Sequence, residues 1–268
     1  KDRIPNGAEH IKKKLPAMYH QFKALANIDI TEEPMEVGPT THYVMGGLRV
    51  DADTQMCTVA GLYAAGECAA GLHGANRLGG NSLSDLIVFG QRAGEHAASY
   101  ADEHGRGTLE DSQIEAAHRE AMAPLERQDQ TDGAGPYGVQ FELQDMMQEK
   151  VGIIREEGTL CEAVEEIAAL ARRADLIGVI GDRKFNPGWH TALDLRHLLS
   201  NSEACARAAL ERKESRGAHS RVDFPDKDKE WGGFTVVLKR GSDGGMEVRR
   251  DPLPPVREDL QKIIEEQS

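Results

Sequence analysis

The most informative part of the sequence is glycine-rich: Gly61-Leu62-Tyr63-Ala64-Ala65-Gly66-Glu67, followed after a short gap by His73-Gly74-Ala75-Asn76-Arg77-Leu78-Gly79-Gly80-Asn81-Ser82-Leu83. The small and apolar residues between Gly61 and Gly66 predict a short buried strand. A helix is expected to open at Ser82, because Ser82 and Asp85 have the spacing of a capping box. The stretch therefore predicts a strand, a glycine-rich loop and a helix in that order, as in α/β folds.

The loop between the strand and the helix has the composition of an anion-binding site. Five glycines between positions 66 and 80 allow the backbone to approach a ligand closely. The N-terminus of the following helix presents free N–H groups and the positive end of its dipole. Arg77 can hold a carboxylate or a phosphate through a two-pronged contact. His42, which precedes a double glycine, is a candidate for a second donor at the same point.

Composition narrows the classes of function. The 268 residues include 32 basic and 45 acidic side chains, for a net charge of −13. This negative net charge repels polyphosphates, so nucleic acid is not an expected partner. No run approaches the roughly 18 apolar residues that a transmembrane helix requires. The four cysteines lie far apart without the spacing of metal ligands, and neither a disulfide framework nor a metal site is expected.

The rest of the chain predicts a helical region and then a small region with a hairpin. Apolar periodicity indicates helices at 110–123, 139–156, 160–173 and 190–213. Two strands, 233–238 and 246–249, flank the turn Gly241-Ser242-Asp243-Gly244-Gly245, and a short helix ends the chain. The expected organisation is a first segment 1–40, an α/β part 41–104, a helical domain 105–213 and a C-terminal domain 214–268.

Several separate blocks carry a resemblance to a known family. They are His42-Tyr43-Val44-Met45-Gly46-Gly47, the two blocks of the glycine-rich stretch, Gly80-Asn81-Ser82-Leu83, and Glu214-Ser215-Arg216-Gly217-Ala218-His219 followed by Asp223-Phe224-Pro225. In this order the blocks resemble the flavoprotein subunit of succinate dehydrogenase and fumarate reductase. The resemblance covers the whole chain, and it implies FAD as cofactor and the interconversion of succinate and fumarate by hydride transfer to the flavin.

The resemblance also implies roles for single residues. His42 and Arg77 would hold the dicarboxylate against the flavin. The cofactor contacts would come from Glu67, Asn81, Ser82 and Leu83, together with Gly46 and Gly47. A helix N-terminus beside the flavin pyrimidine edge makes chemical sense, because reduced flavin carries negative charge there.

Some family features have no counterpart in these residues. The family binds the ADP half of FAD with an N-terminal GxGxxG βαβ unit, which these residues do not include, and the proton-transferring arginine of the family belongs to the same absent part. We therefore expect the chain to correspond to the C-terminal half of the family, with residues 1–40 as the end of the capping domain. We further expect that these residues alone neither hold FAD tightly nor turn over succinate.

Partners and alternatives follow from the same resemblance. An iron–sulfur subunit is the expected electron partner, and any membrane association, at the cytoplasmic inner face of the cell membrane, would come through partner subunits. L-Aspartate oxidase shares the His-Gly-Ala-Asn-Arg loop and is the nearest alternative enzyme. A non-catalytic scaffold that contributes helices to an assembly is the alternative from another class. The direction of the reaction is left open.

Overall fold

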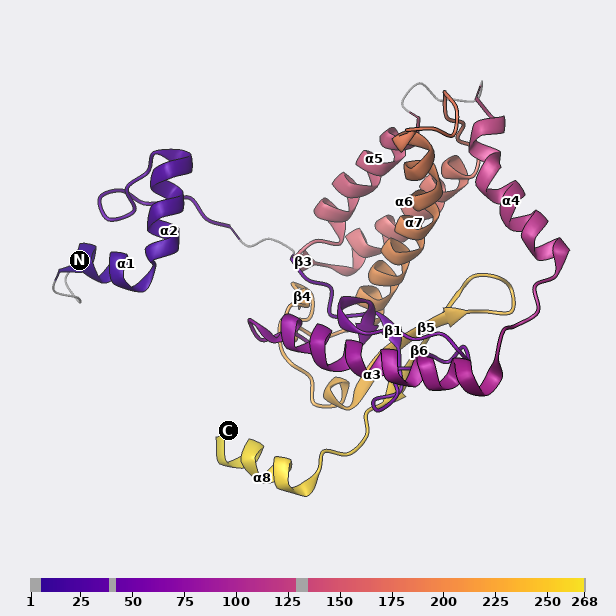
Figure 1. The fold of residues 1–268 in the computed structure, drawn as a ribbon. Coiled ribbons are helices and arrows are strands. Elements are labelled where there is room, and N and C mark those ends of the chain that lie inside the picture. Colours follow the sequence, from indigo (N-terminus) through magenta and orange to yellow (C-terminus); the bar gives the residue numbers. More distant parts are fainter. Residues whose placement is uncertain (1–5, 39–41, 129–134, 268) are drawn as a thin grey trace. The chain divides into compact units, whose positions relative to one another are not determined.

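The computed structural model describes residues 6–38, 42–128 and 135–267. The chain divides into two compact units, Lys1–His42 and Tyr43–Ser268, and each is described by itself. Helices dominate the described residues, and their strands are short and joined in pairs (Figure 1).

The first unit consists of short helices and a loop that one carboxylate anchors to them. Helix α1 (Gly7–Lys14) ends at Leu15, and α2 (Pro16–Gln21) continues into a π-helical turn, Phe22–Ala26. Asp29 accepts a hydrogen bond from Lys23 at 3.2 Å and one from the Tyr19 hydroxyl at 3.4 Å. The hydroxyl and N–H of Thr31 also donate to Asp29 and lower its pKa to about 2. The loop after the helices is thereby fixed to them.

The second unit begins with a parallel strand pair. Strand β1 (Leu48–Arg49) pairs with β2 (Ala69–Ala70), which follows a 3-10 turn at Gly66–Cys68. A Cβ on Gly47 would lie 2.5 Å from the Cys68 carbonyl oxygen, so only glycine permits this close approach.

The strand expected at 61–66 does not form. Tyr63 makes only an isolated bridge to Met56, and Gly61 and Leu62 are exposed. The backbone at Gly61 has φ +82° and at Gly66 φ +75°, a left-handed conformation that interrupts a strand at both ends. The α/β character of this part is thus weaker than the sequence pattern predicted.

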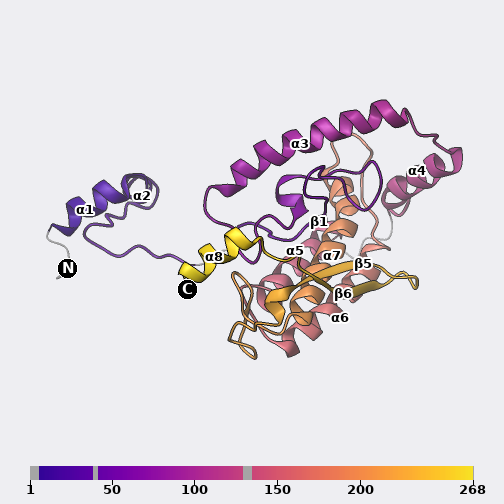
Figure 2. The same ribbon diagram turned by 90° about the horizontal axis from the view of Figure 1, so that it is seen from below.

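Helix α3 (Asn81–His104) follows the glycine-rich loop and runs unbroken through 24 residues (Figure 2). The predicted capping box is wrong. The helix begins one residue before Ser82, and its N-cap is Gly80, which has no side chain to offer. Asp85 is instead buried. The apolar side chains of Leu83, Leu86 and Ile87 are 67%, 52% and 73% exposed, so this face of α3 lies bare in the part of the chain that the structure describes.

The hydrophobic core lies among three helices that pack side by side (Figure 1). They are α5 (Gly135–Lys150), α6 (Glu157–Ala174) and α7 (Pro187–Glu211), and α4 (Asp111–Glu126) lies beside α7. All four helices were expected, with shifted ends. Helix α5 stops six residues before the predicted end, where a Cβ on Gly152 would lie 2.5 Å from the Gln148 carbonyl oxygen.

The C-terminal region adds two more strand pairs and a last helix. Strand β3 (Ile154–Arg155) pairs in parallel with β4 (Ser220–Arg221), and this ladder ties the end of the α5 segment to the region after α7. The expected hairpin is confirmed as β5 (Phe234–Arg240) and β6 (Met246–Pro252). The last element is helix α8 (Glu258–Gln267). No helix among the described residues has the length and apolarity needed to cross a membrane.

Candidate functional site

Arg77 is the centre of the candidate site. The carbon of its guanidinium group lies 4.4 Å from the centre of the Tyr43 ring, a cation–π contact. One terminal nitrogen makes a long 3.5 Å contact with the carbonyl of Leu78. The Nε atom is buried and, among the described residues, has no hydrogen-bond partner. A buried donor without an acceptor costs about 1–3 kcal/mol, so this nitrogen is suited to an acceptor that a ligand would bring.

A buried pair of ionisable side chains supports Tyr43. His73 Nε2 lies 3.4 Å from Asp85 Oδ2, and both side chains are 6% exposed. The same nitrogen lies 3.3 Å from the Tyr43 hydroxyl, and the two rings meet edge to face. Burial raises the pKa of Tyr43, and the carboxylates of Asp85 and Glu67 raise it further, so this hydroxyl stays protonated. The Tyr43 ring, which contacts Arg77, is therefore fixed through His73 by Asp85 in the first turns of α3.

Glu67 connects the two sides of the site. Its Oε1 accepts a hydrogen bond of 2.9 Å from the Val44 N–H, which fixes the segment after Tyr43 to the turn before β2. Gly46 and Gly47 follow after Met45, and nothing lies within 4 Å of the point where a Cβ on Gly46 would stand. The backbone of this segment is thus open on one side.

The N-terminus of α3 forms the far end of the loop. Gly80 precedes the helix with φ +87°, and no side chain caps it. The Asn81 N–H donates to Leu78 and the Leu83 N–H to Gly80, each at 3.2 Å. No acidic residue occupies the first turn, and the positive end of the helix dipole is left without a neutralising charge from within the helix. Asn81, Ser82 and Leu83 therefore form a helix end suited to an electron-rich group.

The structure brings together most, though not all, of the predicted residues. Arg77 contacts Tyr43, and Glu67 accepts a hydrogen bond from the N–H of the next residue, Val44. Asn81–Leu83 lie at the end of the loop that carries Arg77. His42 is exposed and is the last residue of the first unit, so its pairing with Arg77 stays a prediction. Sequence reasoning missed Tyr43 and Asp85 as supports. The signal for Asp85 was there: it is the only acidic residue in the first two turns of the helix.

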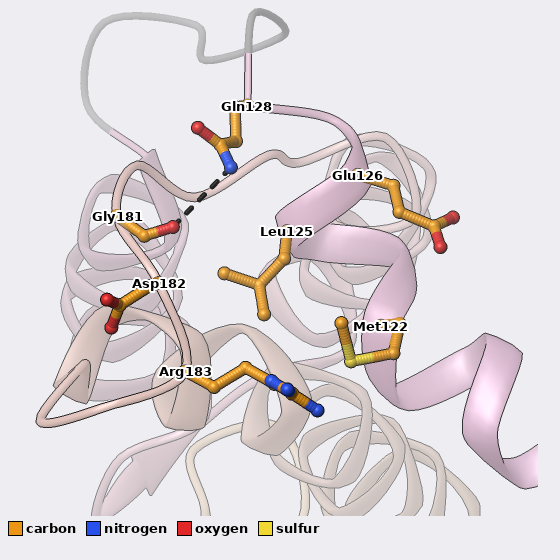
Figure 3. A pocket seen from close by; sticks show the side chains of 7 residues that line it. All are labelled: Met122, Leu125, Glu126, Gln128, Gly181, Asp182 and Arg183. Atoms are coloured by element: carbon orange, nitrogen blue, oxygen red, sulfur yellow. Dashed lines mark hydrogen bonds between the residues drawn. The ribbon is translucent and has the colours of Figure 1, made fainter.

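A pocket of about 290 Å³ lies elsewhere, between the end of α4 and the loop before α7 (Figure 3). Leu125 and Arg183 point toward it, and Gln128 bridges to the Gly181 carbonyl at 3.4 Å. None of the predicted site residues lines it. In the described ranges, no group of three or more His, Cys, Asp or Glu side chains could hold a metal ion.

Comparisons with known proteins agree with the motifs. Residues 6–83 match a family model described as FAD binding domain, and residues 140–262 match one described as fumarate reductase flavoprotein C-term. The fumarate reductase flavoprotein subunit of Mycobacterium tuberculosis is 38% identical over 94% of this chain and 44% of its own length. The succinate dehydrogenase flavoprotein subunit of Coxiella burnetii is 35% identical over 94% of this chain and 46% of its own.

A solved structure gives the same result at the level of the fold. Sdh1 of Mycobacterium smegmatis superposes with a TM-score of 0.85 and 47% identity, over 96% of this chain and 43% of that one. The chain thus spans less than half the length of these relatives. Two family models, relatives in both branches and a close structural match agree, and the chain belongs to the flavoprotein subunits of the succinate dehydrogenase and fumarate reductase family.

Proposed function

We propose that the protein carrying this chain interconverts succinate and fumarate at a bound FAD, and that Arg77 holds the dicarboxylate. The observation that carries this proposal is the orphaned Nε of Arg77, a buried donor on a guanidinium that already lies over the Tyr43 ring. A carboxylate that accepts from this nitrogen and a neighbouring one would satisfy both in a planar, two-pronged contact.

The residues present fit one part of FAD. The uncapped start of α3 at Asn81–Leu83 would hold the electron-rich edge of the flavin, and Gly46, Gly47 and Glu67 would line the cofactor from the Tyr43 segment. When bound, FAD supplies the acceptor and donor of the hydride. The described residues form no binding site for the ADP half of FAD. The part of the relatives that this chain does not span would provide that site.

This chain's own residues bind and orient the substrate. Arg77 fixes one carboxylate, and His42 would hold the other, so that the two central carbons lie in one defined orientation. The buried His73–Asp85 pair keeps Tyr43 in place beneath the guanidinium. We assign no residue of this chain to proton transfer.

Partners and placement are part of the same proposal. Electrons would pass to an iron–sulfur subunit, and attachment to the inner face of the cell membrane would come through partner subunits. The bare apolar face of α3 would pack against polypeptide equivalent to the part of the relatives that this chain does not span. Residues 41–104, 105–213 and 214–268 would serve as cofactor, helical and C-terminal domains.

The test is substrate turnover by the FAD-loaded protein that contains this chain, with Arg77→Lys as the variant. Lysine keeps the charge but loses the planar fork, and we expect kcat/KM for fumarate to fall about 100-fold or more. Arg106→Lys, at an exposed position after α3, is the control and should leave turnover unchanged.

Two outcomes would replace the proposal. Oxidation of aspartate by oxygen, with no turnover of succinate, would identify the alternative enzyme, L-aspartate oxidase. A protein that takes up no flavin and turns over neither substrate would favour the non-catalytic scaffold.

A further inference from the structure

The C-terminal family block, Glu214–His219, has no role in the binding scheme above, yet it forms a tight two-residue turn. The Arg216 N–H donates to the His219 carbonyl at 2.8 Å, and the His219 N–H donates back to Arg216 at 3.1 Å. Gly217, inside this turn, has φ +62°. A non-glycine residue adopts that conformation only at a cost.

The tip of this turn lies directly against the loop that carries Arg77. The Ala218 N–H donates to the Ala75 carbonyl at 3.1 Å. A Cβ on Gly217 would lie 2.2 Å from the same oxygen and 2.5 Å from its carbon. The contact joins backbone to backbone, so glycine is the only residue that fits without moving one of the two segments. It fixes the chain two residues before Arg77.

The turn is itself anchored by a buried carboxylate. Glu214 has no exposed side-chain surface, and it accepts two hydrogen bonds from Arg216, at 2.8 and 3.0 Å. Arg212 donates to it at 2.6 Å and the Asp228 N–H at 2.9 Å. With every oxygen of Glu214 engaged, the turn has a rigid base at the end of α7.

We propose that Gly217 and Arg216 are positioning residues for Arg77. Gly217 allows the turn to contact Ala75, and Arg216 binds the turn to Glu214. Together they fix the position of the 73–77 loop relative to Tyr43. This inference rests on the proposed role of Arg77 for its effect on substrate, but the contact itself can be measured without substrate.

The first test measures hydrogen exchange of the amides in residues 73–78, using Gly217→Ala and a matched control, Gly244→Ala. Gly244 has φ +86° in the hairpin turn and no atom within 4 Å of its Cβ position, so its alanine variant introduces the backbone strain without the collision. We expect exchange in 73–78 to speed up about tenfold or more in Gly217→Ala and to stay at the wild-type rate in Gly244→Ala. Equal rates in all three proteins would overturn the proposal.

A second variant avoids the collision, in case Gly217→Ala does not fold. Arg216→Lys removes the two-pronged contact with Glu214 while keeping the charge. Its control is Arg249→Lys, because Arg249 makes the same two-pronged contact with a carboxylate two residues away, Asp251, on the exposed hairpin. Exchange in 73–78 should rise in the first variant only.

Kinetics of the FAD-loaded protein then test the link to substrate. We expect both Gly217→Ala and Arg216→Lys to raise KM for fumarate about tenfold while kcat falls less, and neither control to change KM. If the wild-type protein turns over no dicarboxylate, the proposed function fails, and the exchange data still decide the contact. If exchange changes and KM does not, the turn stabilises the loop without positioning Arg77, which contradicts the inference.

Discussion

At the scale of single residues, Arg77 depends on an aromatic ring for its position. The guanidinium lies 4.4 Å from the centre of Tyr43, and such contacts contribute about 0.5–2 kcal/mol. We predict that Tyr43→Leu raises KM for fumarate between about twofold and thirtyfold, since each 1.4 kcal/mol corresponds to a factor of ten. Steady-state kinetics of the FAD-loaded protein measure this.

Tyr43→Phe separates the ring from the hydroxyl. Phenylalanine keeps the face beneath Arg77 and loses only the 3.3 Å contact with His73. Its KM should therefore stay close to that of the wild type. A KM that rises as much in Tyr43→Phe as in Tyr43→Leu would show that the hydroxyl, not the ring, supports Arg77.

His219 is a second residue whose chemistry predicts a measurement. Its Nε2 donates to the Arg212 carbonyl at 3.1 Å, so Nδ1 is free of a proton and accepts from Arg155 at 2.8 Å. Burial lowers the pKa of His219, and the neighbouring charges of Arg155, Arg221 and Arg212 lower it further. The folded structure therefore favours the neutral form of the His219 imidazole.

A lowered pKa makes the folded state lose stability as the pH falls below the unfolded value of about 6.5. We predict that the wild-type chain loses stability from this residue as the pH falls from 6.5 to 5. In His219→Gln, whose amide can make both hydrogen bonds, this part of the loss should be absent in urea unfolding curves. The exposed His118→Gln on α4 is the control and should follow the wild type.

At the scale of elements, the helices and the β5–β6 hairpin were predictable, and the shortest strands were not. Helices α4 to α7 carry apolar residues at helical spacing, which a sequence displays directly. Strands β2, β3 and β4 contain two residues each, too few for any alternation to appear. The segment 61–66 shows the opposite error, a strand that was predicted and does not form. Its small apolar residues are typical of a strand, but the positive φ values of Gly61 and Gly66 interrupt one.

Two leucines on different helices test where the core lies. Leu160 on α6 is fully buried, and Leu160→Ala should cost about 2–5 kcal/mol in the free energy of unfolding. Leu83 on α3 is 67% exposed, and Leu83→Ala should change it by less than about 0.5 kcal/mol in this chain. Denaturant unfolding of both variants measures the difference. Equal losses would mean that the face of α3 is covered.

At the scale of the whole molecule, the candidate site joins segments that the sequence keeps far apart. The motifs pointed to Arg77, Glu67 and the start of α3, because glycines and charged residues crowd together there. The contact of Gly217 with Ala75 spans more than a hundred positions, and no local pattern reveals it. The contact of Asp85 with His73 stayed hidden for a simpler reason: the spacing of Asp85 also fits a capping box, and only the helix start at Asn81 rules that out.

Glu214 holds the distant parts of the second unit together, and its titration predicts how the molecule responds to acid. Burial alone would raise its pKa, but hydrogen bonds from Arg216, the Asp228 N–H and Arg212 outweigh burial and lower the pKa from 4.5 to about 2. Stability from this group is therefore fully present above about pH 4.5 and is lost as the pH falls toward 2, an effect of about 3 kcal/mol.

The variant Glu214→Gln isolates this contribution from those of the other carboxylates. It should be less stable than the wild type at pH 7, because four hydrogen bonds lose a charged acceptor. The difference between the two unfolding free energies should then shrink as the pH is lowered from 4.5 to 2.5, since the wild-type carboxylate takes up its proton there. A difference that stays constant over this range would mean that Glu214 is not the acid-sensitive link between α7, the 216–219 turn and the segment at Asp228, and the base proposed for the Arg77 loop would have to lie elsewhere.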